Sequence, residues 1–130
     1  MKWRKIARED LQIGHQIWIE KANENLASAQ LCFEQGHFNA CANRLYYAMF
    51  HAAIAALAKA GALSMNKKIG HDWLQANFSS QLIHQRKVVS SKFRSYLPEA
   101  LRIRVVADYE VTTVSQSIAA SQLKKAKEFV

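Results

Sequence analysis

The stretch "CANRLYYAMFHAAIAALAKAG", residues 41–61, decides the fold of this chain. Alanine and other apolar residues dominate it, and it holds no proline and no glycine before Gly61, which predicts a long and largely buried helix. A buried polar group is costly unless it is paired or serves a function. The stretch nevertheless carries Asn43, Arg44, Tyr46, Tyr47 and His51 among its apolar residues.

The spacing of these residues gives the helix two different faces. Because each residue of an α-helix turns about 100° around the axis, Arg44, Tyr47 and His51 lie close together on one face. The small residues Ala48 and Ala55 lie on the same face, so another helix or a ligand can approach it closely. The opposite face carries Tyr46, Phe50, Ala53 and Leu57. We therefore expect one face to enter the core and the other to form a polar site.

The rest of the chain also has helical patterns. Apolar residues recur at helical spacing over residues 10–35, and Gly36 should end that helix, with Asn39 as the cap of the next one, residues 40–60. Further helices are expected over residues 69–83, over 88–110, where Pro98 must start a new helix or kink the old one, and over 114–129 with Thr112 or Thr113 as the N-cap. The short linker at Gly36 predicts an antiparallel pair. We predict one all-α domain, residues 1–130, folded as an up-and-down bundle of about five helices.

The charge of the chain is concentrated in its middle. The net charge is +8, and between Glu34 and Glu99 eight basic residues accompany a single acid, Asp72. Such a segment favours an anionic partner, nucleic acid or a nucleotide, and Lys67 and Lys68 are candidate contacts. The alternative is a solvated basic face that only aids solubility.

Several classes of protein are excluded or disfavoured. No apolar run reaches the roughly 18 residues of a membrane span, and the start "MKWRKIARED" lacks the apolar part of a signal peptide, so we expect a cytoplasmic protein with no membrane contact. Cys32 and Cys41 are expected to be free thiols, although a disulfide is the alternative. The segment "EQGH", residues 34–37, has the Glu-x-x-His spacing of di-iron bundles, but it occurs once and Gly36 interrupts it. We expect neither a metal nor another cofactor.

Arg44 and His51 are the strongest candidates for chemistry. Arginine can hold a phosphate through two hydrogen bonds, and histidine can act as an acid or base near neutral pH. RNA cleavage needs no metal in principle, because the 2′-hydroxyl supplies the nucleophile. The structural alternative is a buried hydrogen-bond network in which Arg44 pairs with a carboxylate, for which Asp108 is the obvious candidate.

Two other segments carry polar residues of interest. In "RIRVVADYEV", residues 102–111, Arg104 and Asp108 are four residues apart and can form a surface pair, and Tyr109 follows them. His71, at the start of a helix, is expected to face solvent.

The segment "NRLYYAMFHAA", residues 43–53, resembles the HEPN superfamily, the small helical domains of prokaryotic toxin–antitoxin and defence systems, and in particular its short stand-alone branch. The resemblance leaves out the first ten residues and covers residues 24–57, His71 with Phe78, "RVVADYEVT" at 104–112 and the closing "AKEFV" at 126–130. It implies a helical bundle that dimerises around a shared cleft. Many members are metal-independent endoribonucleases with an Arg and a His a few residues apart, and many are encoded beside a minimal nucleotidyltransferase that serves as antitoxin. Others are non-catalytic modules that bind nucleotides or RNA.

Six residues separate Arg44 from His51, which fits this spacing. In well-studied members, however, the motif lies on a late helix, and here no histidine follows Arg104. The resemblance implies a homodimer that binds RNA or a nucleotide, with endoribonuclease activity as the toxin half of a pair with a nucleotidyltransferase. The alternative is a non-enzymatic helical module that binds a partner protein. The catalytic candidates are Arg44 and His51, and the binding candidates are Asn43, Tyr47, Arg104, Asp108, Tyr109, Lys67 and Lys68.

Overall fold

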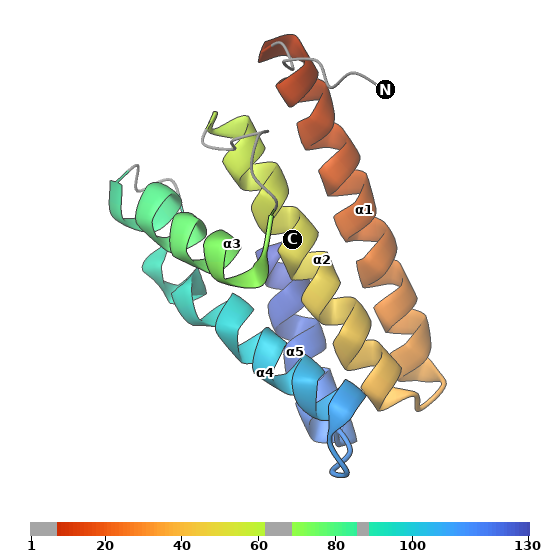
Figure 1. The fold of residues 1–130 in the computed structure, drawn as a ribbon. Coiled ribbons are helices and arrows are strands. Elements are labelled where there is room, and N and C mark those ends of the chain that lie inside the picture. The colour runs from red at the N-terminus through yellow and green to blue at the C-terminus, as the bar shows by residue number, and fades with distance from the viewer. Residues whose placement is uncertain (1–7, 62–68, 86–88) are drawn as a thin grey trace.

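The computed structural model describes residues 8–61, 69–85 and 89–130, and within these ranges the chain forms a helical bundle (Figure 1). The α-helices are α1 (Arg8–Glu34), α2 (Phe38–Lys59), α3 (His71–Asn77), α4 (Tyr96–Tyr109) and α5 (Gln116–Phe129). A π-helical segment, η1 (Phe78–Gln85), continues α3, and a short 3₁₀ turn, η2 (Ser91–Ser95), leads into α4. The predicted all-α bundle is confirmed.

The turn between α1 and α2 depends on Gly36. Its φ of +74° lies in the left-handed region, which glycine adopts without a steric penalty. The amide of Gly36 donates to the carbonyl of Phe33 at 3.0 Å, and that of His37 donates to the carbonyl of Cys32 at 2.8 Å. This pair of bonds is a Schellman motif, which satisfies the last carbonyls of α1 and turns the chain back. The predicted antiparallel pair of α1 and α2 is therefore present (Figure 1).

Two predicted helix caps are wrong. Asn39 lies inside α2, whose N-cap residue is His37, and its Oδ1 atom instead accepts a hydrogen bond from the amide of Val114 at 2.9 Å. Neither Thr112 nor Thr113 caps α5, because that helix begins later, with the Ser115 side chain accepting from the amide of Ile118 at 3.2 Å.

Of the two alternatives expected at Pro98, the structure has the start of a new helix rather than a kink. Pro98 lies in the first turn of α4, where its missing N–H removes no bond within the helix. The chain before it forms the separate turn η2 rather than a longer helix.

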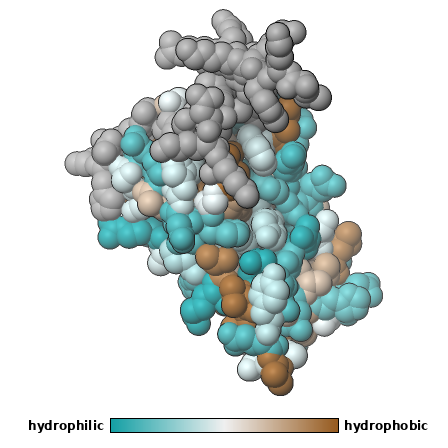
Figure 2. All heavy atoms as spheres, viewed as in Figure 1, coloured by the Kyte–Doolittle hydropathy of each residue, from teal (hydrophilic) through white to brown (hydrophobic). Residues whose placement is uncertain are grey.

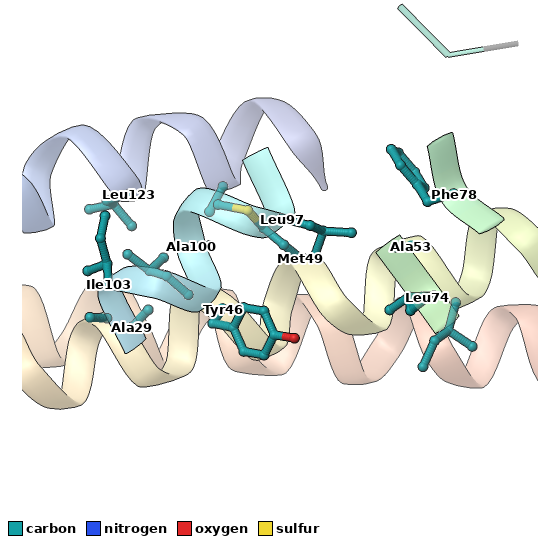
Figure 3. Close-up of a cluster of buried hydrophobic side chains, with 14 of the residues drawn as sticks. Ala29, Tyr46, Met49, Ala53, Leu74, Phe78, Leu97, Ala100, Ile103 and Leu123 are labelled. Atoms are coloured by element: carbon teal, nitrogen blue, oxygen red, sulfur yellow. The ribbon is translucent and has the colours of Figure 1, made fainter. Parts of the chain in front are cut away.

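Helix α2 forms the centre of the core. Its side chains Tyr46, Met49 and Ala53 pack among residues contributed by the other helices (Figure 3). These come from α1 (Ala29), from α3 and η1 (Leu74 and Phe78), from α4 (Leu97, Ala100 and Ile103) and from α5 (Leu123). On the apolar face expected for α2, Tyr46, Ala53 and Leu57 are buried and Phe50 is partly buried. Two residues of the expected stripe of α1, Ile17 and Ile19, stay exposed.

The face of the molecule shown in Figure 2 is mostly hydrophilic. On the face shown in Figure 2, hydrophobic residues form separate small patches among hydrophilic ones. No helix in the described ranges is long and apolar enough to cross a membrane.

Cys32 and Cys41 are free thiols. Burial, together with the nearby Cys32, raises the pKa of the Cys41 thiol to about 11.

Candidate functional site

Arg44 is held by two neutral side chains. Its Nη1 atom donates to Oδ1 of Asn25 on α1 at 3.0 Å, and its Nε atom donates to Oδ1 of the neighbouring Asn43 at 3.0 Å. The Nη2 atom donates to the same oxygen of Asn43. Since a guanidinium carries five N–H groups, these three bonds leave two for a ligand. The side chain is only partly buried, and its Cζ atom lies 5.6 Å from the centre of the Tyr47 ring.

Asp108 is not the direct partner of Arg44, so that expectation is wrong. Its Oδ2 atom accepts from Nη1 of Arg104 at 3.1 Å and from Nδ2 of Asn43 at 3.0 Å. Arg104 lies four residues before Asp108 on the same helix and is the arginine that pairs with this carboxylate. Asn43 therefore stands between Asp108 and Arg44, with its amide toward the carboxylate and its oxygen toward the guanidinium.

His51 lies on the same face of α2, one turn beyond Tyr47. Its Nδ1 atom is 3.0 Å from Nδ2 of Asn25, and its ring centre is 5.3 Å from that of Trp18. Burial, followed by the positive charges of Lys21 and Arg44, lowers the pKa of His51 below its ordinary value of 6.5. This lowered pKa favours the neutral form of the imidazole.

Arg104 lies among three tyrosine rings. Its Cζ atom is 5.6 Å from the ring centres of Tyr46 and Tyr47 and 5.8 Å from that of Tyr109. Its Nη1 atom also donates to the hydroxyl of Tyr47 at 3.4 Å. Contacts of this kind, between a cation and the faces of aromatic rings, stabilise the cation. The Nε atom of Arg104 is buried and has no hydrogen-bond partner among the described residues.

The structure thus brings most of the predicted site residues together. One network of hydrogen bonds joins Asn43, Arg44, Tyr47, Arg104 and Asp108. His51 joins this network through Asn25, and Tyr109 lies at its edge with 75% of its surface exposed. Lys67 and Lys68 lie outside the described residues.

Asn25 was not among the site residues predicted from the sequence. The sequence does place Asn25 three residues after Ala22 and four before Ala29. The structure shows that both alanines are fully buried. Residues at these spacings share one face of a helix, so an amide stands in the buried face of α1.

His71 is not a simple solvent contact either. Its Nδ1 atom is hydrogen-bonded to the hydroxyl of Tyr46. Tyr46 is fully buried, and a buried phenol normally finds a hydrogen-bond partner. Burial raises the pKa of Tyr46, so the phenol stays protonated. The contact fastens the start of α3 to the middle of α2.

No group of three or more His, Cys, Asp or Glu side chains is placed to hold a metal ion in the part of the chain that the structure describes.

The family model of the HEPN domain matches residues 15–130, a range that includes every residue of the network described above. The chain belongs to the HEPN domain family. No curated protein matches it. Membership in the HEPN family supports a function related to nucleotides or RNA.

Proposed function

We propose that this HEPN domain binds the phosphate groups of RNA or of a nucleotide on the face that carries Arg44 and His51. The observation that supports it is the environment of Arg44. Its three bonds go to neutral amide oxygens, and no carboxylate of the described residues lies within ion-pair distance of it. A partly buried guanidinium whose charge is not neutralised attracts an anion, and phosphate matches its planar set of donors.

The neighbouring residues have supporting roles in this proposal. Asn43 orients the guanidinium, and Arg104 with Asp108 holds Asn43 in place. The hydroxyl of Tyr47 and the exposed ring of Tyr109 are available to the sugar and base of a nucleotide. Lys67 and Lys68 would add phosphate contacts.

The catalytic part of the proposal is a metal-independent endoribonuclease. The 2′-hydroxyl of RNA gives up its proton to water as its oxygen attacks the adjacent phosphorus, the bond to the 5′-oxygen breaks, and the leaving oxygen takes up a proton. Arg44 would stabilise the charge of the phosphoryl oxygens, and His51 would donate a proton to the leaving oxygen. In this proposal the chain is a homodimer and the toxin-like half of a pair with a minimal nucleotidyltransferase.

Binding of a labelled single-stranded RNA, measured by fluorescence anisotropy, tests the proposal. Arg44→Gln should weaken binding about tenfold or more, because a charge-assisted bidentate contact is lost. Arg102→Gln, which removes an exposed arginine of α4, is the matched control and should have a much smaller effect. Affinity should also fall steeply as salt rises. Equal losses in the two variants would mean that only net charge matters, and the proposed site would be wrong.

The same samples are checked for RNA fragments. Fragments that disappear in His51→Ala would support cleavage at this site, whereas fragments that persist would contradict it.

The second candidate is a non-enzymatic module that binds a partner protein. The connection between α4 and α5 favours it, because Tyr109 is largely exposed and Val111 is fully exposed. Exposed apolar side chains of this kind are typical of contact surfaces between proteins. A chain that binds no RNA at low salt would leave this candidate as the better one.

A further inference from the structure

Asn25 contacts both principal residues of the proposed site. Its Oδ1 atom accepts from Nη1 of Arg44 at 3.0 Å, and its Nδ2 atom lies 3.0 Å from Nδ1 of His51. The same Nδ2 atom donates to the backbone carbonyl of Lys21 at 3.1 Å. One short side chain of α1 thus touches the cation and the imidazole of α2 at the same time.

These contacts allow only one orientation of the Asn25 amide. The carbonyl of Lys21 can only accept a hydrogen bond, and the guanidinium of Arg44 can only donate one. If the amide were turned over, its oxygen would face the carbonyl and its N–H groups would face the guanidinium. The amide nitrogen therefore faces His51, and both of its hydrogens are used, one for Lys21 and one for the imidazole.

This orientation assigns the proton of His51. Since Asn25 donates at Nδ1, the Nδ1 atom must accept, and the proton of the neutral ring then sits on Nε2. Protonation of Nδ1 would place one N–H group against another. In the described part of the chain, Nε2 has no hydrogen-bond partner, and the side chain is only partly buried. The Nε2–H group is therefore left for a ligand.

We propose that Asn25 is the positioning residue of this site and that it holds His51 as the neutral tautomer with its proton on Nε2. The charged groups around the ring of His51 also favour its neutral form. Lys21 of α1 and Arg44 of α2 are both cations, and together with burial they lower the pKa of His51. No carboxylate of the described residues forms an ion pair with the imidazole.

The tautomer determines what His51 offers to a ligand, a consequence that rests on the proposed phosphate site. Both His51 and Arg44 present N–H donors, so the pair is suited to the oxygens of a phosphate. Because Nε2 carries a proton and Nδ1 is engaged, His51 has no free lone pair. It cannot take the proton of a 2′-hydroxyl unless the contact with Asn25 breaks. The site as folded is a phosphate receptor rather than a proton acceptor.

Long-range ¹H–¹⁵N correlation NMR of the full chain tests this inference. The His51 ring is identified by the signals that His51→Ala removes. In the parent protein Nδ1 should have the shift of a bare nitrogen and Nε2 that of a protonated one, and the ring should stay neutral below the ordinary histidine pKa. A ring protonated at Nδ1 in the neutral state, or an equal mixture of tautomers, would overturn the inference.

Asn25→Asp gives a second and independent reading. A carboxylate can only accept, so it should move the proton to Nδ1 and favour the imidazolium by about tenfold or more in the protonation equilibrium. Asn23→Asp adds the same charge at an exposed position of the same helix and is the control. Equal pKa shifts in the two variants would contradict a direct contact. If Asn25→Asp does not fold, the NMR measurement of the His51 tautomer in the parent protein is sufficient to test the inference.

The function is tested separately by adding inorganic phosphate and then a short RNA to the labelled parent. If the tautomer is as expected but neither ligand moves the His51 signals, the phosphate site is wrong and the role of Asn25 stands. If the ligands move the signals of a ring protonated at Nδ1, only the role of Asn25 is wrong.

Discussion

Asp108 joins two helices, because Arg104 of α4 and Asn43 of α2 donate to the same carboxylate oxygen. The side chains of Arg104 and Asp108 are only 13% and 25% exposed, so solvent weakens their attraction less than on an open surface. Double-mutant cycles from urea unfolding should therefore give a coupling free energy of at least about 0.5 kcal/mol for Arg104→Ala with Asp108→Ala. The cycle of Arg44→Ala with Asp108→Ala should give a smaller value, since Asn43 separates the two. A larger coupling for Arg44 would instead favour the direct pair expected from the sequence.

The sequence is sufficient to predict which site residues share a face of α2, but not which residues of other helices they contact. The shared face of Arg44, Tyr47 and His51 follows from the turn per residue of a regular helix, so it needs no knowledge of the other helices. The partners of these residues depend on the positions of α1 and α4 along the axis of α2. The periodicity within one helix does not determine these positions. Asn25 was therefore missed, and the expected pair of Arg44 with Asp108 is absent, whereas the pair of Arg104 with Asp108, which lies within one helix, is confirmed.

At the scale of single elements, the turn after α1 depends on the backbone of Gly36. A Cβ atom at this position would meet nothing within 4 Å, so Gly36→Ala should act only through its φ of +74°. A left-handed conformation costs most L-residues about 1–2 kcal/mol, and the free energy of unfolding in urea should fall by that amount. Gly36→Asn is the matched variant and should lose less, because asparagine tolerates this conformation. An equal loss in both variants would mean that φ is not the cause.

Helix starts were harder to predict than helix ends. Gly36 requires a left-handed backbone, and this requirement is local. Asn39 could cap its own helix, but its oxygen binds the distant amide of Val114. The amide of Val114 is engaged by this bond, and α5 begins after it, with Ser115 rather than Thr113 as the cap. Tertiary contacts thus decide between caps that look equivalent in the sequence.

At the scale of the whole molecule, the exposed connection between α4 and α5 lies beside the proposed site, since Tyr109 contacts Arg104. If the proposed homodimer covers this region, Val111→Lys should shift the protein from dimer to monomer in analytical ultracentrifugation at micromolar concentration. Leu31→Lys, which places the same charge at another exposed apolar position on α1, is the control and should leave the dimer intact. A monomeric parent protein would contradict the dimer, and dissociation by Leu31→Lys alone would move the interface to α1.

The reach of Asn25 depends on residues that have no polar side-chain atoms. A single methylene separates its amide from the backbone, so the amide can meet Arg44 and His51 only where α1 and α2 approach closely. Fully buried alanines, Ala22 and Ala29 on α1 and Ala48 on α2, lie beside these residues along the two helices and permit that approach. A library screened for loss of ligand binding should therefore recover bulky replacements of these alanines as readily as changes to the charged residues, although the alanines themselves touch no ligand.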